Sequence, residues 1–428
     1  MKKQAAAFLA RHDMHYEQMP FGELMDRFSD EMARGLAGES SSLFMLPTYT
    51  GVHGEPARHE SVLVMDAGGS NLRAARMHFD DSGKPVVDEM RKCRMPGAGD
   101  EIDAEEMFAR MAALALEVCG DAKRACISFS YVFDALPNGD GRIHRLCKEV
   151  HVRGIEGSPV TAPLEAAMQR LGAPGERRWT LINDSVGTLL GGMAQADRSR
   201  FDDYIGFIVG TGTNSCCCLR AETITKSPEA MAFGGDMIVN LESGCFDKLL
   251  QGTVDRDIDQ NSEVPGDHVA EKMISGEYFP HLLKKTLLLA EKEGLLSAQA
   301  AENLAAFTVK SLHIDQLCLD PQGDNPISNA MTSKGERQVA FAVAELLLER
   351  AARIVAACLC AILRRRALPR GSRVCICADG TTFRKNPLLR PMVERYLAKG
   401  AGEALGVETE FLFTEDATAK GCAWAGLC

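Results

Sequence analysis

A Gly-Gly turn at residues 68–69 has the residue types that could hold a phosphate group. An apolar run at 62–65 leads into Asp66 and then into Gly68-Gly69-Ser70-Asn71. The two glycines let the backbone approach a ligand closely, and their N–H groups, with the Ser70 and Asn71 side chains, can donate to phosphate oxygens. Asp66 offers a hard oxygen for hydrated Mg²⁺, and Arg73 a permanent positive charge. An ordinary hairpin with a Gly-Gly turn explains the stretch equally well, because short glycine motifs are common.

Three later segments place small and acidic residues directly after an apolar strand. They are Asn183-Asp184-Ser185, the loop 210–215 and the loop 378–382. Asn, Asp and Ser before a helix are good N-cap residues, which is the purely structural interpretation. A carboxylate at the carboxyl end of a strand is also where α/β folds place catalytic groups. Donor-rich loops on either side of Asp184 favour one nucleotide site assembled from distant parts of the chain.

Two familiar nucleotide-binding motifs are missing. The sequence has no GxxxxGK[ST] segment, and Gly210-x-Gly212-x-x-Ser215 does not match the dinucleotide-binding fingerprint. The motifs therefore disfavour P-loop and Rossmann chemistry.

The elements that must position these loops follow an α/β pattern. Apolar periodicity predicts a hairpin over 62–79, a strand over 86–93, a helix over 107–118 and a strand over 125–132. Residues 1–50 are expected to form one or two amphipathic helices packed on the body. The remaining predicted strands are 179–182, 204–209, 373–377 and 407–413, with a strand and turn over 237–246 that holds Glu242 among apolar neighbours. The remaining helices are 163–171, 186–196, 269–278, 279–293, 336–367, 386–400 and 418–427; the predicted loops include 226–235 and 251–265.

Composition excludes several classes of function. The chain has 428 residues, enough for two or three domains, with 46% hydrophobic and 25% charged residues. A net charge of −11 argues against nucleic acid or an anionic membrane as partner. It does not oppose ATP, which needs only a local cluster of donors.

Cysteine usage and the N-terminus indicate the compartment. The 15 cysteines form no CxxC pair, so neither a disulfide framework nor a zinc site is expected, and reduced cytosol fits best. Residues 1–10 make a poor signal peptide, and no run reaches the ~18 uncharged apolar residues of a membrane helix. We therefore expect a soluble, cytoplasmic protein.

Taken in order, these loops resemble the blocks of the hexokinase family, the glucokinase-like sugar kinases of the actin-like ATPase superfamily. The resemblance runs from about residue 60 to the C-terminus. DAGGSNLRAAR and IVGTGTNS are similar to its phosphate blocks, SFSY to its sugar-recognition segment, and LINDSVGTLL to its catalytic-aspartate block. VNLESGCFD and VPGDHVAEKMISGEYFPHLLKK resemble two further sugar blocks, ICADGTTFRKNP the adenosine block, and TEDATAKGCAWAGL the start of the C-terminal helix.

The resemblance implies an α/β fold of two ribonuclease-H-like lobes with the active site in the cleft between them. It implies a domain division into a helical lead-in (1–60) packed on the large lobe, a small lobe (61–182, with the C-terminal helix 417–428) and a large lobe (183–416). The hexose pocket would be lined by Ser130, Lys148, Asn183, Asp184, Asn214, Glu242 and Glu271. Mg-ATP would be held by Asp66, Gly68, Gly69, Ser70, Asn71, Arg73, Thr211, Gly212, Gly380 and Thr381.

The resemblance therefore predicts an ATP-dependent hexokinase. The γ-phosphate of ATP would pass to the 6-hydroxyl of a hexose such as glucose, with Asp184 as general base and Lys148 as a second catalytic residue. Mg²⁺ would be held mainly through ATP phosphates and water, with no dedicated protein metal site. The expected partners are the hexose and ATP, with no nucleic acid or membrane, in a monomer or homodimer.

Several positions depart from the family pattern. Cys147 replaces a threonine before Lys148, His268 replaces a glutamine, and Val132 replaces a proline. Residues 417–420 have Ala-Thr-Ala-Lys where glycine and serine are usual. His268 would either contact a sugar substituent or fill space. These departures leave two alternatives open: a non-catalytic sugar sensor or regulator on the same fold, and a kinase of another sugar.

Overall fold

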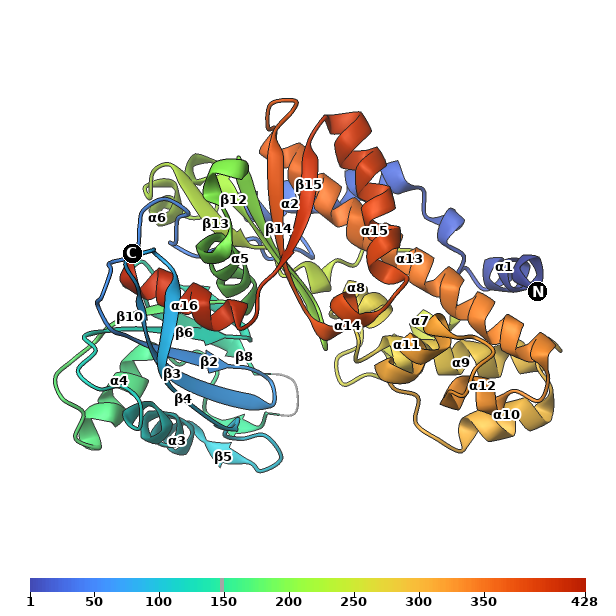
Figure 1. Ribbon diagram of the computed structural model, residues 1–428, viewed down its shortest axis with the longest axis horizontal. Helices are drawn as coiled ribbons and strands as arrows, with labels where there is room; N and C mark the ends of the chain where they lie inside the picture. The colour runs from blue at the N-terminus through green and yellow to red at the C-terminus, as the bar shows by residue number, and fades with distance from the viewer. Residues whose placement is uncertain (147–149) are drawn as a thin grey trace.

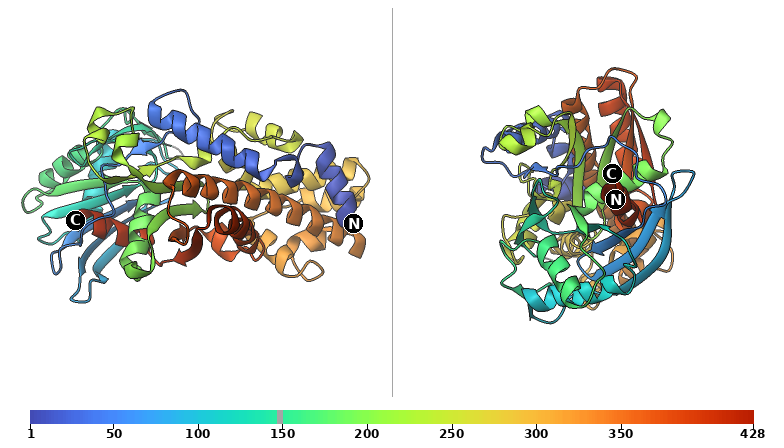
Figure 2. Two further views of the ribbon diagram at one scale, coloured as in Figure 1. Left: turned by 90° about the horizontal axis from the view of Figure 1, so that it is seen from above. Right: turned by 90° about the vertical axis from the view of Figure 1, so that its left-hand side faces the viewer.

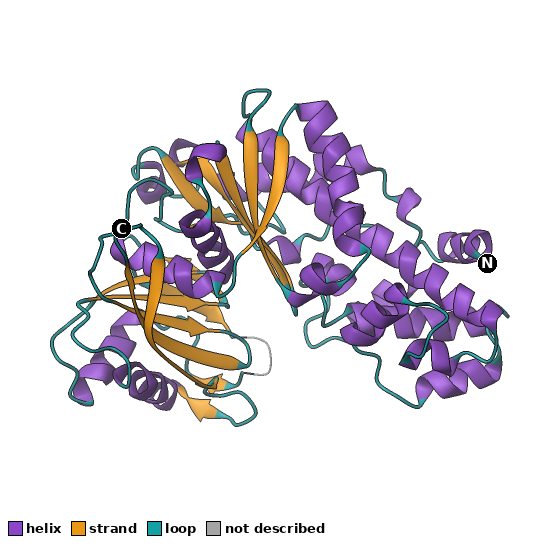
Figure 3. Cartoon of the chain, in the orientation of Figure 1, coloured by secondary structure: helices purple, strands orange, loops and turns teal. Residues whose placement is uncertain are grey.

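The structure is a computed structural model that describes residues 1–146 and 150–428, and it contains two main β-sheets (Figures 1 and 3). The strands of the five-stranded sheet, in spatial order, are β10 (Arg178–Ile182), β6 (Arg124–Phe129), β2 (Val62–Ala67), β3 (Asn71–Phe79) and β4 (Pro85–Arg94). The strands of the six-stranded sheet are β1 (Leu46–Pro47), β13 (Asp236–Asn240), β12 (Thr213–Arg220), β11 (Asp203–Val209), β14 (Arg373–Asp379) and β15 (Glu408–Phe413). Two small pairs join β5 (Ile102–Asp103) to β9 (Val152–Arg153) and β7 (Val132–Ala135) to β8 (Gly141–Arg145).

The two sheets repeat one topology. In the first, β2, β3 and β4 form an antiparallel meander, and β6 and β10 run parallel to β2 on its other side. In the second, β11, β12 and β13 form the meander, and β14 and β15 run parallel to β11. Strand β1 extends the second sheet beyond β13. Because the strand order repeats, a loop that follows a strand in the first sheet has a counterpart at the equivalent strand end of the second sheet.

Two helices cross between the sheets. Helix α5 (Asp184–Gln195) follows β10, and helix α16 (Ala417–Leu427) follows β15 (Figure 3). Their backbones touch: a Cβ on Gly191 would lie 2.0 Å from the Ala417 carbonyl oxygen, and one on Gly421 would lie 1.9 Å from that of Gly187. Only glycine permits this contact. The crossing therefore fixes where the first residues of both helices lie.

The other helices flank the sheets or form the helical part of the second lobe. Those that precede β13 in the chain are α1 (Lys2–Arg11), α2 (Phe21–Ala37), α3 (Ala104–Leu116), α4 (Thr161–Arg170) and α6 (Pro228–Met231). Those of the C-terminal half are α7 (Thr253–Gln260), α8 (Val269–Ile274), α9 (Phe279–Lys292), α10 (Ala298–Ala305), α11 (Ser311–Leu319), α12 (Pro326–Ala330), α13 (Lys334–Arg366), α14 (Thr381–Lys385) and α15 (Leu389–Leu397). Single turns of 3₁₀ helix lie at Tyr16–Gln18, Arg198–Arg200, Ala221–Thr223 and Ser243–Cys245, and a π-helical stretch lies at Ala398–Leu405.

The longest helix, α13, organises the largest core. The N-terminal helices α1 and α2 pack along it, as the view from above shows (Figure 2). Phe8 and Phe28 are fully buried in the same apolar cluster as α13 and the strands of the second sheet. We propose that residues 1–60 belong with the large lobe for this reason, and we retain 61–182 with 417–428 as the small lobe and 183–416 as the large lobe.

Three sequence expectations differ from the structure. The segment 251–265 is not all loop, because Thr253–Gln260 forms helix α7. The few apolar residues of this helix give little periodic hydrophobic pattern in the sequence. The helix is held by a tertiary contact, because the buried carboxylate of Asp255 accepts two hydrogen bonds from Arg350, at 2.6 and 2.7 Å. The short segment 228–231, expected as loop, is helix α6.

The third difference is a break in the helix expected over 269–278. Helix α8 ends at Ile274, and α9 begins at Phe279. Gly276, between them, donates its N–H to the Gly210 carbonyl at 2.7 Å, and a Cβ there would lie 2.1 Å from Thr382 Oγ1. The break brings three loops of the second lobe into contact. Within the described residues, no helix has both the length and the apolar composition needed to cross a bilayer.

Candidate active site

Asp184 is the first residue of helix α5, directly after the carboxyl end of β10. The preceding residue, Asn183, is the N-cap, and its Oδ1 accepts hydrogen bonds from the N–H of Ser185 at 2.9 Å and the Ser185 hydroxyl at 2.7 Å. The two interpretations of the sequence are therefore compatible: Asn183 caps the helix, and Asp184 is left half-buried beside it. The N-terminus of a helix favours a negatively charged side chain.

Buried amides connect Asn183 to the second lobe. Asn214 Nδ2 donates to Asn183 Oδ1 at 3.2 Å and to Asn240 Oδ1 at 3.0 Å. Asn240 Nδ2 in turn donates to Glu242 Oε1 at 2.8 Å. All four side chains are at most 8% exposed, so their polar atoms depend on one another for hydrogen bonds. Such a network holds its members in fixed orientations.

Glu271, at the start of α8, lies against the same loop. Its Oε2 accepts the N–H of Thr213 at 2.8 Å. A Cβ on Gly212 would approach this oxygen to 2.5 Å, and one on Gly244 would approach it to 3.4 Å. Glycine at 212 is thus required for Glu271 to reach the loop. Glu242 and Glu271 are brought to one place from segments 29 residues apart.

Asp66 lies at the end of β2, opposite Arg73 in the hairpin. Burial raises the pKa of Asp66 to about 6; the positive charge of Arg73 lowers it, and the negative charges of Asp184, Asp379 and Asp416 raise it. The four carboxylates come from the ends of β2, β10, β14 and β15 and act on one another. Arg73 also donates to Asp416 Oδ1 at 3.1 Å, which joins the hairpin to the start of α16.

The first donor loop, the Gly-Gly turn at residues 68–71, is closed by hydrogen bonds. Gly68 donates its N–H to the Asn71 carbonyl at 3.0 Å, and the Tyr131 hydroxyl donates to the Gly68 carbonyl at 3.0 Å. Ser130 donates its N–H to the Ala67 carbonyl at 3.1 Å, which places the segment 128–131 beside this turn. Ser70 is exposed.

The loop 210–215 and the loop 378–382, which are the second and third donor loops, touch each other. Gly210 donates its N–H to the Gly212 carbonyl at 2.9 Å, and Thr382 Oγ1 donates to the Gly210 carbonyl at 3.1 Å. Gly380 has a φ of 109°, and a Cβ there would lie 2.2 Å from the Val209 carbonyl oxygen, so only glycine fits. Thr211 and Thr381 are exposed at the tips. These two loops form one surface.

The residues present fit a magnesium-bound nucleoside triphosphate. Within the described part of the chain, the backbone N–H groups of Gly69, Ser70, Thr211 and Gly212 donate no hydrogen bond, which leaves them available to phosphate oxygens. Among residues 1–146 and 150–428, no three of the four carboxylates bring oxygens within 4.8 Å of one another. Mg²⁺ prefers oxygen ligands, which these carboxylates, a bound nucleotide's phosphates and water would offer.

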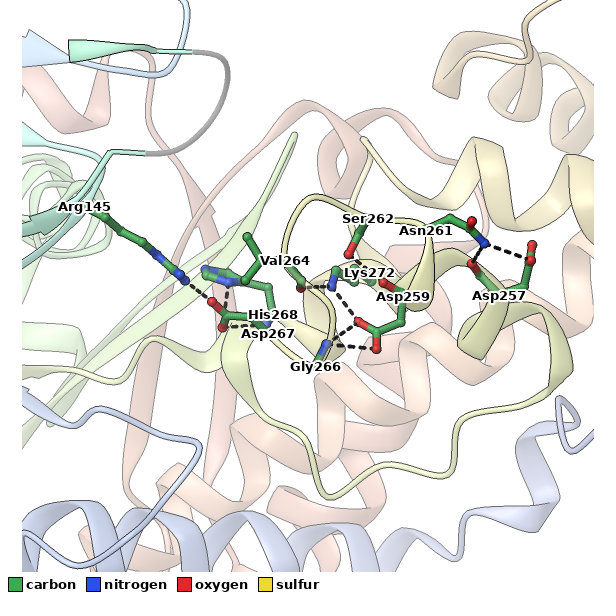
Figure 4. Close-up of polar contacts among 10 residues, drawn as sticks. All are labelled: Arg145, Asp257, Asp259, Asn261, Ser262, Val264, Gly266, Asp267, His268 and Lys272. Carbon is green, nitrogen blue, oxygen red and sulfur yellow. Dashed lines mark hydrogen bonds and ion pairs between the residues drawn. The ribbon is translucent and has the colours of Figure 1, made fainter. Parts of the chain in front are cut away.

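An ion pair also links the two lobes beside the candidate hexose site (Figure 4). Arg145, the last residue of β8, contacts Asp267 Oδ2 in the loop before α8. Asp267 Oδ1 lies 3.0 Å from the ring nitrogen Nδ1 of His268. The same oxygen accepts a hydrogen bond from the backbone N–H of His268 at 2.8 Å. Burial by itself lowers the pKa of His268, but a hydrogen bond to Cys245 and the negative charges of Glu271 and Glu242 outweigh it and raise that pKa.

The structure thus brings together most of the predicted residues. Asn183, Asp184, Asn214, Glu242 and Glu271 form one group, and Asp66, Arg73, Ser130 and the three donor loops lie around the neighbouring strand ends. Lys148 and Cys147 lie outside the described residues. Sequence reasoning missed Asn240, Asp379 and Asp416. Asn240 could have been found in the sequence, because it is a polar residue that ends an apolar strand two positions before Glu242. Asp379 and Asp416 could have been found because they lie at or just after the ends of predicted strands.

Comparison with known proteins gives one consistent result. Two family models, both described as hexokinase, match residues 6–194 and residues 204–428. The chloroplastic hexokinase-4 of Oryza sativa subsp. japonica is 28% identical over 415 residues, which are 90% of this chain and 79% of that protein. Hexokinase-1 of Schizosaccharomyces pombe is 26% identical and covers 93% of this chain and 85% of its own length. Mouse hexokinase-3 is 27% identical over 97% of this chain, which spans only 46% of that longer protein.

Solved structures agree with the fold. The hexokinase of Schistosoma mansoni complexed with glucose superposes with a TM-score of 0.79 at 22% identity, covering 100% of this chain and 99% of that one. The glucokinase of Balamuthia mandrillaris in complex with glucose gives a TM-score of 0.54 at 15% identity, covering 94% and 98%. The repeated sheets are therefore the two ribonuclease-H-like lobes of the actin-like ATPase fold. One of the two family models alone matches more than half of the residues of this chain. The chain therefore belongs to the hexokinase family of sugar kinases.

Proposed function

We propose that this protein is an ATP-dependent hexokinase that phosphorylates the 6-hydroxyl of a hexose such as glucose, with Asp184 as general base. The observation that carries the proposal is the buried network from Asn183 through Asn214 and Asn240 to Glu242, which begins beside Asp184. Its members are amides and a carboxylate, the groups that a polyhydroxylated sugar needs as hydrogen-bond partners. Glu271 adds a second carboxylate from the same side.

In this proposal, Asp184 does the proton chemistry. Its carboxylate would accept the proton of the 6-hydroxyl as the oxygen attacks the γ-phosphorus and the bond from that phosphorus to the β-phosphate oxygen breaks. General base catalysis of this kind contributes about 10²–10⁴-fold. The proton would leave from Asp184 to solvent after the product departs. Because Asn183 orients the start of α5, it acts as a positioning residue for this step.

Bound Mg-ATP would supply the phosphoryl group and neutralise its charge. The chain's share is positioning: the N–H groups of the turn at Gly69 and Ser70 and of the loop at Thr211 and Gly212 would hold phosphate oxygens. Arg73 would add a positive charge beside them, since it is anchored by Asp416. Gly380 and Thr381 would border the nucleotide from the third loop. Asp66 would contact the metal through water.

A coupled assay across hexoses tests the proposal. ADP formation with ATP would be measured for glucose, mannose, fructose, glucosamine and N-acetylglucosamine, with calorimetry of each sugar in parallel. We expect turnover with at least one unsubstituted hexose. Hexose binding with no turnover would instead support a sugar sensor, turnover only with an amino sugar would support a kinase of another sugar, and neither binding nor turnover would refute the proposal.

A further inference from the structure

Three potential metal ligands converge beside the candidate hexose site, and the mechanism above uses none of them. They are the thiol of Cys245, a carboxylate oxygen of Asp267 and one ring nitrogen of His268, and the three atoms all lie within 4.8 Å of one another. Cys245 is buried, and the other two side chains are about one-quarter exposed. Among the described residues, this is the one such group of three with ligand atoms this close.

The surroundings hold these ligands in place. Arg145 contacts Asp267 Oδ2 from the other lobe and leaves Oδ1 directed at His268 (Figure 4). Cys245 is the last residue of the 3₁₀ turn Ser243–Cys245, and its N–H donates to the Glu242 carbonyl at 3.0 Å. His268 is the N-cap of α8 in a left-handed conformation with φ of 51°. A ligating carboxylate that is itself hydrogen-bonded is the usual arrangement in metal sites.

We propose that Cys245, Asp267 and His268 form a binding site for a borderline-soft divalent cation such as Zn²⁺. Sulfur and imidazole nitrogen favour Zn²⁺ over Mg²⁺, which prefers oxygen ligands. Three protein ligands would leave the fourth tetrahedral position to water. The thiol proton would leave to solvent as the sulfur–metal bond forms. Nearby Glu242 and Glu271 add negative charge that attracts a cation.

The position of the site predicts an effect on the sugar, and this part rests on the proposed function. Cys245 follows Glu242 by three residues, and His268 precedes Glu271 by three. A metal bound between the two segments would draw the 3₁₀ turn and the start of α8 together and change the separation of the two glutamates. Zn²⁺ would therefore inhibit by raising the KM for hexose, and Mg²⁺ would not mimic it.

Cobalt substitution tests the site without relying on activity. The metal-free full chain would be titrated with Co²⁺, whose thiolate charge-transfer band reports a sulfur ligand. We expect one equivalent of Co²⁺ to produce the band and Zn²⁺ to abolish it. Cys245→Ser should remove the band, and His268→Gln should weaken Co²⁺ binding about tenfold or more. The matched control Cys93→Ser, which removes an exposed thiol on β4, should keep the wild-type titration.

Two outcomes would overturn the site: no charge-transfer band in the wild-type chain, or a band that survives Cys245→Ser. Thermal melts of each variant would show whether it folds, and Cys245→Ala, which also removes the sulfur, replaces Cys245→Ser if that variant does not. In the activity arm, Zn²⁺ should raise the hexose KM of the wild type but not of His268→Gln. An unchanged KM with Co²⁺ bound would refute the coupling alone. A Co²⁺ band in a chain that phosphorylates no hexose would leave the metal site standing and refute the proposed function.

Discussion

At the scale of single residues, Asp66 shows what the candidate site costs the folded chain. Its carboxylate is removed from most solvent and lies near three other negative charges, with Arg73 as the opposing positive charge. The pKa of Asp66 is consequently raised from 3.8 to about 6. At neutral pH the folded protein carries this ionised group at a cost, which bound Mg²⁺ would offset.

Asp66→Asn should therefore stabilise the protein without ligands. A carboxyl group with a raised folded-state pKa loses stability as pH rises from 3.8 to about 6, so above pH 6 the wild type bears the whole penalty. We expect the variant to gain about 1–3 kcal/mol in free energy of unfolding at pH 7, to gain little at pH 4, and to lose turnover. Urea unfolding at both pH values measures this, with exposed Asp121→Asn as a neutral control. An equal gain at both pH values would contradict the account.

Asn240 should matter for hexose affinity although it needs no contact with the sugar. Asn240→Ala removes one hydrogen-bond partner each from Asn214 and Glu242 in a buried network. Losing a buried partner of this kind costs about 1–3 kcal/mol, and a cost of that size borne by hexose binding corresponds to an increase in hexose KM of roughly 5- to 150-fold. Steady-state kinetics would measure it, and surface Asn329→Ala is the control. If KM for hexose stays at the wild-type value in a folded variant, the network does not support the pocket.

Residue types in the sequence predicted much of the candidate site but not its connections. Asp66 and Asp184 lie where apolar strands end, and the glycines stand in the turns that follow strands, so local pattern marks them. The sequence marks Asn240 only as a polar residue at the end of an apolar strand, and its role depends on Asn214, 26 residues away. Hydrogen bonds between distant segments leave no trace in local periodicity.

At the scale of elements, the crossing of α5 and α16 positions the acidic residues. The helices meet at glycines with no room for a side chain, so α5, which begins at Asp184, and α16, which follows Asp416, are held against each other. Each helix alone was predictable from its apolar pattern, and their contact was not. Helix α7 was missed for a related reason: its stability depends on Arg350, on another helix.

Gly191→Ala should separate the crossing helices. The new Cβ would start 2.0 Å from the Ala417 carbonyl oxygen, so backbone has to move. Overpacking of this kind typically costs about 1–3 kcal/mol, and turnover should fall because Asp184 moves with α5. Gly22→Ala in α2, where nothing lies within 4 Å, is the matched control and should leave both quantities near wild type. Thermal melting with a turnover assay compares the two. Full stability in Gly191→Ala would show that the crossing tolerates a side chain.

At the scale of the whole molecule, the repeated sheet explains how a site can be built from distant segments. Equivalent strand ends of the two lobes bring β2, β10, β11, β14 and β15 to one region. The net charge of −11 does not prevent phosphate binding, because the donor loops supply N–H groups locally. The α/β pattern and the hairpin of the first lobe were visible in the sequence. The strand β12 beyond the second donor loop, and hence the repeat itself, became visible only in three dimensions.

The central claim is that Asp184 accepts the proton in phosphoryl transfer, and Asp184→Asn tests it most directly. Sugar-dependent ADP formation and calorimetric hexose binding would be measured on the same preparation. The account predicts that kcat falls about 10²–10⁴-fold while hexose affinity changes far less, since the amide keeps the size of the side chain and its place at the start of α5. Undiminished turnover, or a loss of hexose binding as large as the loss of turnover, would contradict it.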